Sequence, residues 1–423
     1  MRPVRRTSLY RLTGLLAVML AAGPAWASSL EQAVMRGLAR HPEVQAAQAE
    51  VRMAQTEVAM SRNSYLPTLG ASAGPAAAGL GYDVSVSQTL YDWGQTRGVV
   101  DQKRALLEQQ RANLEVVRDD VALQITEVYL DVASARAQLS MLDGHLERLN
   151  SLAEMARTRV EGRYSDESET GRVGLAVATA QGAQARLRGT LAEATDLYRL
   201  LVDEPPNGVR LPQPPAFLET VANEGALEAA VTNSPLYRKA ALSVRVADAS
   251  VREAQAARYP RLNLEGSVQR REIGGRMIDD STIGIRFRLS TQPGLSALQR
   301  PQLEAQRREV ASWNAQTAAR NLKRTVSSLG ATEGALDARI AALGEQAGQA
   351  ERVRDLYREQ FLVGRRDIQD LVIMETEQFE AERQLVELTI ERLRLQYRAA
   401  AQLGLLASAM TDDAASPPAG DGQ

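Results

Sequence analysis

Few residues in this 423-residue chain could carry out chemistry. It contains no cysteine, which excludes thiolate catalysis, disulfide bonds and cysteine-ligated metals. Its two histidines, His41 and His145, are too few for a multi-histidine metal site. The sequence has no Ser-His-Asp set, no His-Glu-x-x-His motif and no phosphate-binding glycine loop. We therefore predict that the protein is not an enzyme and binds no metal or cofactor.

The remaining candidates are charged side chains at two similar glycine-containing turns. Residues 162–168 read Gly-Arg-Tyr-Ser-Asp-Glu-Ser, and residues 364–370 read Gly-Arg-Arg-Asp-Ile-Gln-Asp. Each turn stands between two long helical patterns. In the second turn Asp367 occupies a natural N-cap position and Asp370 lies three residues further on, where acidic groups favour a helix start. A capping role and a functional role are compatible for both acids.

Composition narrows the class of protein further. Fifty basic and fifty-two acidic side chains give a net charge of −2, so the chain lacks the basic excess of a nucleic-acid binder. Aromatic residues make up only 4%, which favours long helices packed through Ala, Leu and Val. Compact domains stop growing at roughly 250–300 residues, so we expect two units or one elongated shape.

The N-terminal segment has the pattern of a signal peptide. A positively charged start with four arginines precedes a short apolar stretch at 12–22, and Ala25-Trp26-Ala27 matches the pattern read by signal peptidase. We therefore expect export from the cytoplasm. No cysteine follows the expected cleavage site, which argues against a lipid anchor there.

The rest of the chain contains two copies of the same sequence pattern. Pro42 and Pro67 are 25 residues apart, as are Pro235 and Pro260, and each pair encloses a helical segment followed by alternating strand patterns. A proline-rich stretch separates the two copies. The predicted organisation starts with a signal peptide at 1–27 and ends with a disordered tail at 411–423. The first repeat, at 28–203, contains strands at about 68–91, a long helix at about 94–161 and a return helix at about 170–202. After a linker at 204–217, the second repeat, at 218–410, contains strands at about 261–289, a long helix at about 296–361 and a return helix at about 368–409.

The long helices carry a coiled-coil pattern. Twelve apolar positions from Val121 to Val160 step by alternating four and three residues, and ten of the twelve positions 201 residues later, from Leu322 to Phe361, are again apolar. The stripe predicts helix packing rather than ligand binding. On this pattern His145 falls on the polar side of the coiled coil, and His41 borders a helix start.

The strand segments alternate apolar and polar residues. This pattern fits transmembrane β-barrel strands, and it also fits half-buried hairpins in a soluble sheet. Aromatic residues at the strand ends favour the barrel, because such residues form belts at membrane interfaces. These are Tyr65, Tyr82, Tyr91, Trp93 and Tyr259. Four strands cannot close a barrel, so we expect several chains to share one, and three chains would supply twelve strands.

The duplicated pattern resembles the TolC family of outer-membrane export ducts over nearly the whole chain after residue 27. The most specific local sequence is Leu90-Tyr91-Asp92-Trp93-Gly94, at the boundary between strand and long helix. The resemblance implies a mainly α fold with a small β part, assembled as a homotrimer. Its twelve-stranded transmembrane β-barrel would continue into a periplasmic α-helical coiled-coil barrel. It also implies contact with outer-membrane lipid, a periplasmic adaptor (a membrane fusion protein) and an inner-membrane transporter, here an ABC transporter.

The resemblance places a closed periplasmic gate at the two turns, around residues 163–169 and 364–373. Asp370 matches the first of two acidic positions that face the channel, whereas the second position is Ile373. Three copies of Asp370 would attract cations to the mouth. Arg366 matches a basic residue that ties the closed coils to the neighbouring turn. The gate candidates are Asp370, Arg366, Asp367, Glu167 and Ser168.

Three functions follow as alternatives. The first is the outer-membrane duct of a type I secretion machine for an adhesin or toxin, because the Leu90–Gly94 junction resembles members with such cargo. The second is the duct of a small-molecule, drug or metal efflux pump. The third, from another class, is a periplasmic coiled-coil scaffold or adaptor, although adaptors carry one hairpin and this sequence predicts two.

Overall fold

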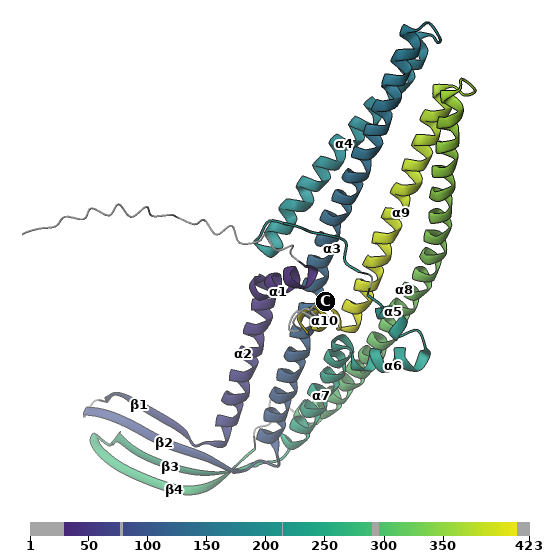
Figure 1. Cartoon of the computed structure of the whole chain (residues 1–423). Helices are drawn as coiled ribbons and strands as arrows, with labels where there is room; N and C mark the ends of the chain where they lie inside the picture. The colour runs from purple at the N-terminus through teal and green to yellow at the C-terminus, as the bar shows by residue number, and fades with distance from the viewer. Residues whose placement is uncertain (1–28, 77–78, 214, 290–295, 413–423) are drawn as a thin grey trace, which may run out of the picture.

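The chain forms an elongated molecule with a small sheet at one end and two long helical hairpins at the other (Figure 1). A computed structural model describes residues 29–76, 79–213, 215–289 and 296–412. The predicted signal peptide at 1–27 lies outside these residues. The first half comprises α1 (Leu30–Arg40), α2 (Pro42–Arg62), a 3-10 turn η1 (Asn63–Tyr65), β1 (Thr68–Ala76), β2 (Gly79–Tyr91), α3 (Gln95–Glu161) and α4 (Glu167–Val202). The second half comprises α5 (Phe217–Thr220), α6 (Glu224–Asn233), α7 (Pro235–Ala256), β3 (Arg261–Ile273), β4 (Arg276–Arg288), α8 (Ser296–Leu362), α9 (Ile368–Leu403) and α10 (Leu406–Asp412).

The lengths of these elements confirm the duplicated fold. The long helices α3 and α8 each have 67 residues, and the return helices α4 and α9 each have 36. Both elements of the second hairpin begin and end 201 positions after their counterparts in the first. At 1.5 Å per residue a 67-residue helix is ~100 Å long, which accounts for the elongated shape.

The hairpins are held together by the predicted apolar stripe. Leu142, Leu149 and Ala156 of α3 are fully buried against Val173 and Ala180 of α4. The helix α3 also packs on α2, α7 and α9, so apolar positions on several of its faces are covered. The helix α8 packs mainly on α7 and α9 and is more exposed than α3.

The largest core lies midway along the molecule, where α1, α3, α4, α9 and α10 meet. Ile125 and Leu130 of α3 are completely buried there, together with Tyr198 of α4 and Leu406 of α10. This core joins the first described helix, α1, to the last described helix, α10. It therefore fixes the two hairpins relative to each other at their base.

The second return helix is shorter than predicted, which corrects the expected range of 368–409. The helix α9 ends at Leu403 because Gly404 adopts φ +76, a left-handed conformation that closes helix ends. A β-carbon on Gly404 would lie 2.0 Å from Cδ of Pro235, so the close approach also requires glycine. The chain then forms α10, which extends to Asp412. The tail predicted from residue 411 is thus helical at 411–412, and residues 413–423 lie outside the described part.

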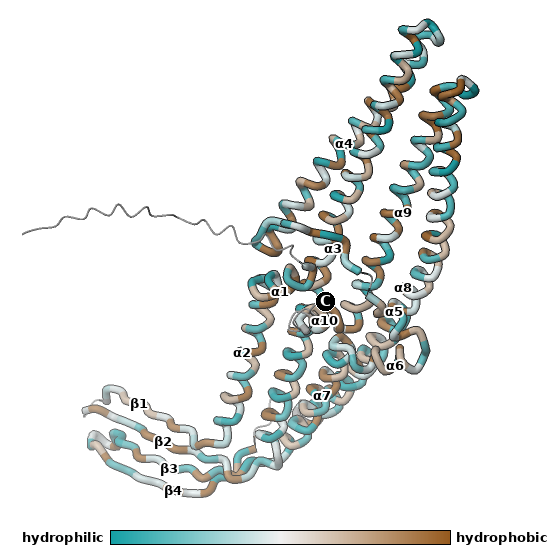
Figure 2. Tube along the Cα trace, in the orientation of Figure 1, coloured by the Kyte–Doolittle hydropathy of each residue, from teal (hydrophilic) through white to brown (hydrophobic). Residues whose placement is uncertain are grey.

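The four strands form one antiparallel sheet in the order β1-β2-β3-β4, so the two repeats join through β2 and β3. Val84 pairs with Val268, and Leu264 pairs with Ile285, which gathers apolar side chains on one face. Ser85 pairs with Ser267 on the other face. Figure 2 shows apolar and polar positions interleaved along the strands and both hairpins. None of the described helices is both long and apolar enough to cross a membrane.

Candidate functional site

The junction between β2 and α3 follows from the sequence at 90–94. The carboxylate of Asp92 caps α3, because Oδ1 accepts the N–H of Gly94 at 3.0 Å and Oδ2 accepts that of Thr96 at 2.7 Å. Trp93 has φ +59, a conformation that L-residues rarely adopt. Its indole Nε1 donates to the carbonyl oxygen of Pro260 at 3.0 Å. The motif therefore ends a strand, starts a helix and ties the first repeat to the second.

Three of the five predicted interface aromatics meet at this junction. The ring centroids of Tyr91 and Trp93 are 5.0 Å apart, and those of Trp93 and Tyr259 are 4.9 Å apart. Tyr65 lies at the same end of the sheet, just before β1, and these four side chains are about half exposed. Tyr82 lies nine residues along β2 from Tyr91, roughly 30 Å away at strand spacing. The predicted aromatics therefore mark both ends of the sheet rather than one cluster.

The first hairpin turn is closed by Asp166. Its carboxylate accepts the N–H of Ser168 at 2.8 Å, so α4 starts at Glu167 and not near residue 170 as predicted. Hydrogen bonds from Ser168 lower the pKa of Asp166. Glu167 and Ser168 are both exposed. They are available to a partner outside this hairpin.

The second hairpin turn differs in its cap. Asp367 has the extended backbone of an N-cap, but its side chain makes no capping hydrogen bond, which corrects the predicted capping role. Asp370 instead accepts a hydrogen bond from Nη1 of Arg366 at 3.2 Å. Arg366 also donates to Gln360 at 3.1 Å and lies 4.0 Å from the ring centroid of Tyr357. The structure thus brings Arg366 and Asp370 together within one hairpin.

The predicted tie from Arg366 to the first turn is absent within one chain. Among the described residues, no hydrogen bond or ion pair joins Arg366 to Glu167 or Ser168. Near the turns, the two hairpins make contact through Arg159 of α3, whose guanidinium lies 4.8 Å from the ring centroid of Phe361 in α8. Nε of Arg159 is also 3.7 Å from a carboxylate oxygen of Glu169.

A buried polar cluster links the hairpins further from the turns. His145 of α3 is 4% exposed and stacks on Phe379 of α9, with centroids 4.4 Å apart. This corrects the prediction that His145 faces the polar side of the coiled coil, because α9 covers the face on which it lies. Glu375 of α9 forms an ion pair with Arg148 of α3, and Nδ1 of His145 is 3.9 Å from its carboxylate. Burial opposes ionisation of Glu375, but these two neighbours outweigh it and lower its pKa.

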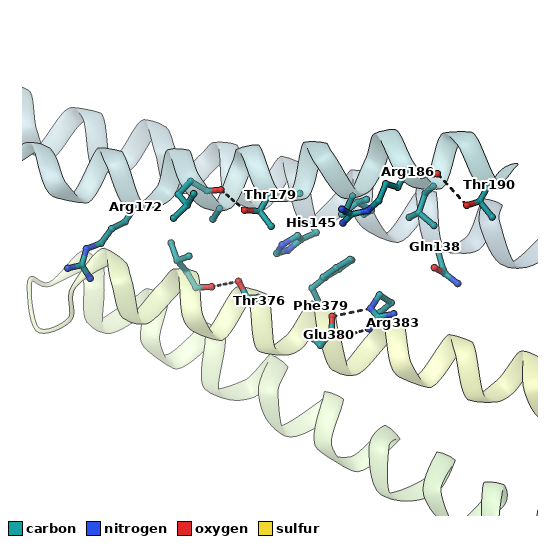
Figure 3. Close-up of a pocket in the computed structure, with 17 residues that line it drawn as sticks. Gln138, His145, Arg172, Thr179, Arg186, Thr190, Thr376, Phe379, Glu380 and Arg383 are labelled. Carbon is teal, nitrogen blue, oxygen red and sulfur yellow. Dashed lines mark hydrogen bonds and ion pairs between the residues drawn. The ribbon is translucent and has the colours of Figure 1, made fainter. Parts of the chain in front are cut away.

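A groove of about 680 Å³ runs beside this cluster, between α4 and α9 (Figure 3). Its floor includes His145 and Phe379, and Thr179, Thr376 and other polar side chains lie along its sides. Arg383 on one wall pairs with Glu380 and Glu387 of the same helix. The groove follows the contact between hairpins, so any relative movement of α4 and α9 would reshape it.

Sequence reasoning missed these cross-hairpin residues. His145, Arg148 and Glu375 are scattered polar residues in helices, and helical periodicity assigns such residues to solvent. A buried ion pair depends on which helix faces which, and this is not encoded locally. The only signal was the unusual placement of a histidine close to the apolar stripe.

Comparisons with known proteins agree with this architecture. Residues 34–201 match the sequence profile of a family described as outer membrane efflux protein. The chain is similar to the outer membrane protein VceC of Vibrio cholerae, with 16% identity, a TM-score of 0.75, and coverage of 89% of this chain and 96% of that one. It is similar to the outer membrane channel MtrE of Neisseria gonorrhoeae, with 18% identity, a TM-score of 0.75 and 89% of each chain covered. A membrane protein from Pseudomonas aeruginosa gives 16% identity, a TM-score of 0.77, and coverage of 88% and 90%. None of the curated protein sequences matches the chain.

Proposed function

We propose that the chain is a member of the outer membrane efflux protein family, whose model matches residues 34–201, and that three copies form a passive duct through the outer membrane and the periplasm. The sheet of each copy contributes four strands to a twelve-stranded barrel, and the hairpins form the periplasmic tube. Members of this family transport rather than catalyse. Energy therefore comes from an inner-membrane pump, which a periplasmic adaptor connects to the hairpin ends.

The open amphipathic sheet is the observation that carries this proposal. β1 and β4 each have one neighbour in the sheet, so a single chain leaves two edges of unpaired backbone groups. Its apolar face is uncovered: Leu69 is 75% exposed, Ile283 83% and Phe287 73%. Pairing β4 of one copy with β1 of the next would satisfy both edges. Lipid would then cover the apolar face, and the polar face would line the channel.

Adjacent residues on opposite faces of β4 test the proposal. A lysine on a lipid-facing strand position costs ~2–4 kcal/mol near the bilayer centre. We therefore expect Ile283→Lys to abolish recovery of trimer from detergent-solubilised outer membranes, and Thr282→Lys on the polar face to be tolerated. Light scattering of the wild type should give three times the 46.0 kDa of one chain, after allowance for the signal peptide. A folded monomer recovered without detergent would instead support the periplasmic scaffold.

Two classes of substrate are considered for the proposed duct. We assign the duct to type I protein secretion with an ABC transporter, because the Leu90–Gly94 junction resembles members that export adhesins or toxins. The alternative, small-molecule or metal efflux, is favoured by the description of the matching family. Deleting the gene should abolish secretion of a large surface protein and leave drug and metal sensitivity unchanged. The opposite pattern would establish efflux.

The gate residues stay part of this proposal. Asp370, Arg366, Asp367, Glu167 and Ser168 lie at the ends of the hairpins furthest from the sheet (Figure 1). In the trimer the exposed Glu167 and Ser168 of one copy could be met by a basic group of the next. We expect Arg366→Ala to increase single-channel conductance in planar bilayers by loosening this end.

A further inference from the structure

The polar face of the sheet is not uniform along the strands. Its middle carries hydroxyl groups, because Ser85, Ser267 and Thr282 stand in register across β2, β3 and β4. Further out, Asp83 and Asp280 flank Gln269 in the same register. The hydroxyl zone thus separates the acidic pair Asp83 and Asp280 from the helical end of the sheet.

The helical end of the same face carries arginines. Arg286 and Arg288 of β4 both converge on one carboxylate, that of Glu265 in β3, at 3.2 and 2.6 Å. Their side chains are 64% and 60% exposed, whereas that of Glu265 is 19% exposed. One guanidinium would be enough to balance Glu265, so each chain presents one unbalanced positive charge here. We call Arg286 and Arg288 the arginine band.

Neighbouring charges do not cancel this excess. Arg261, opposite Arg288 in the register, donates to Gln95 at 2.8 Å and lies near the carboxylate of Asp92. The acidic pair Asp83 and Asp280 lies six residues along β4 from Arg286, ~20 Å at strand spacing. That distance exceeds the Debye length of ~10 Å at 0.1 M salt, so the two zones act separately.

We propose that the arginine band gives the duct a preference for anionic solutes at the helical end of the barrel. The inference rests on the proposed trimer, in which the polar face lines the channel and three copies of the band surround one axis. Six guanidiniums then face three carboxylates around the channel. Guanidinium groups keep their charge at all physiological pH values and present planar pairs of donors that suit carboxylates and phosphates. The band is placed where the helical tube passes into the barrel, so every solute crosses it.

Charge-changing variants at the band should shift selectivity in opposite directions. The double variant Arg286→Gln/Arg288→Gln removes six positive charges from the trimer and leaves the three Glu265 carboxylates. Glu265→Gln removes three negative charges and keeps all the arginines. Arg270→Gln is the matched control, because Arg270 lies on the apolar face of the same sheet and pairs with Asp279 at 2.6 Å. None of these changes touches the gate at the other end of the molecule.

The measurement is the reversal potential of single trimers in planar bilayers under a tenfold KCl gradient. From Coulomb's law with screening, we expect the double variant to shift the chloride-to-potassium permeability ratio toward potassium by about threefold at ~0.1 M salt, and less at 1 M. Glu265→Gln should shift the ratio toward chloride, and Arg270→Gln should leave it unchanged. Because Glu265→Gln keeps both arginines, it tests the inference even if the double variant fails to assemble.

The outcomes separate this inference from the duct itself. Conducting trimers whose reversal potential is the same in the wild type, the double variant and Glu265→Gln would overturn the anion preference and leave the duct intact. An equal shift in Arg270→Gln would also overturn it, because the effect would then not depend on the channel-facing side. A wild-type trimer that carries no current at all would overturn the proposed duct and this inference together.

Discussion

Asp119 should make the stability of the protein depend on pH. This carboxylate of α3 is 3% exposed and accepts the N–H of Ala407 at the start of α10 at 2.9 Å. Burial raises its pKa from 3.8 to about 6, an effect that Asp120 and Glu115 reinforce and that hydrogen bonds from α10 only partly offset. A raised pKa means that the folded state binds a proton more tightly than the unfolded state. Protonation of Asp119 therefore stabilises the fold.

The size and direction of the effect follow from the two pKa values. The stabilisation is complete below pH 3.8 and is lost as the pH rises through about 6. The difference between the two pKa values corresponds to ~3 kcal/mol in total, of which ~1 kcal/mol is lost between pH 5 and pH 8. Asp119→Asn removes the titration but keeps an oxygen that can accept the N–H of Ala407. We expect the melting temperature of this variant to differ less between the two pH values than that of the wild type, with Asp120, whose pKa is also raised, supplying part of the remaining dependence.

Thermal melting of the purified protein at pH 5 and pH 8 measures this difference. The matched control is Asp196→Asn, because the Asp196 side chain is 77% exposed on α4. The control should keep the pH dependence of the wild type. Full pH dependence in Asp119→Asn, or its loss in Asp196→Asn, would contradict the assignment of this effect to Asp119.

Three further changes test other parts of the structure. Glu375→Gln leaves Arg148 without its buried partner and should weaken the packing of α9 on α3 by ~1–3 kcal/mol of free energy. Amide hydrogen exchange in α9 should then be faster, and unchanged exchange would contradict a structural role for the pair. Residue 404 has a left-handed backbone, and Gly404→Ala would place a β-carbon 2.0 Å from Pro235. We therefore expect the melting temperature to fall by several degrees. An unchanged melting temperature would show that α9 need not end at this glycine. Asp92→Ala removes the acceptor of two backbone N–H groups, so the free energy of unfolding measured with denaturant should fall by ~1 kcal/mol. Asp92→Asn should recover most of that loss.

The two hairpin turns show why identical spacing does not give identical chemistry. Asp166 and Asp367 occupy equivalent positions 201 residues apart, yet only Asp166 caps its helix through its side chain. In the second turn Arg366 engages Asp370, and in the first turn the residue equivalent to Arg366 is Ser165. The two turns therefore have equivalent positions in the repeats, but a side-chain cap stabilises the first and an ion pair stabilises the second. The two turns are expected to contribute differently to any gate.

The elements and their order follow from side-chain type and spacing alone. Helical and alternating periodicities are local properties, so the long helices, the four strands and the 201-residue displacement between repeats could be predicted from side-chain type and spacing. The motif at 90–94 likewise predicted the boundary between β2 and α3, because capping by Asp92 needs only residues two and four positions away.

Which polar groups contact one another depends on how the elements pack. His145 was expected on the polar side of its helix and is buried, because α9 covers that side. The contact between Arg159 and Phe361, the pair of Arg148 with Glu375, and the convergence of Arg286 and Arg288 on Glu265 all join different elements. Such contacts depend on helix rotation and strand register. These are fixed by the packing of the whole molecule, and no local pattern in the sequence specifies them.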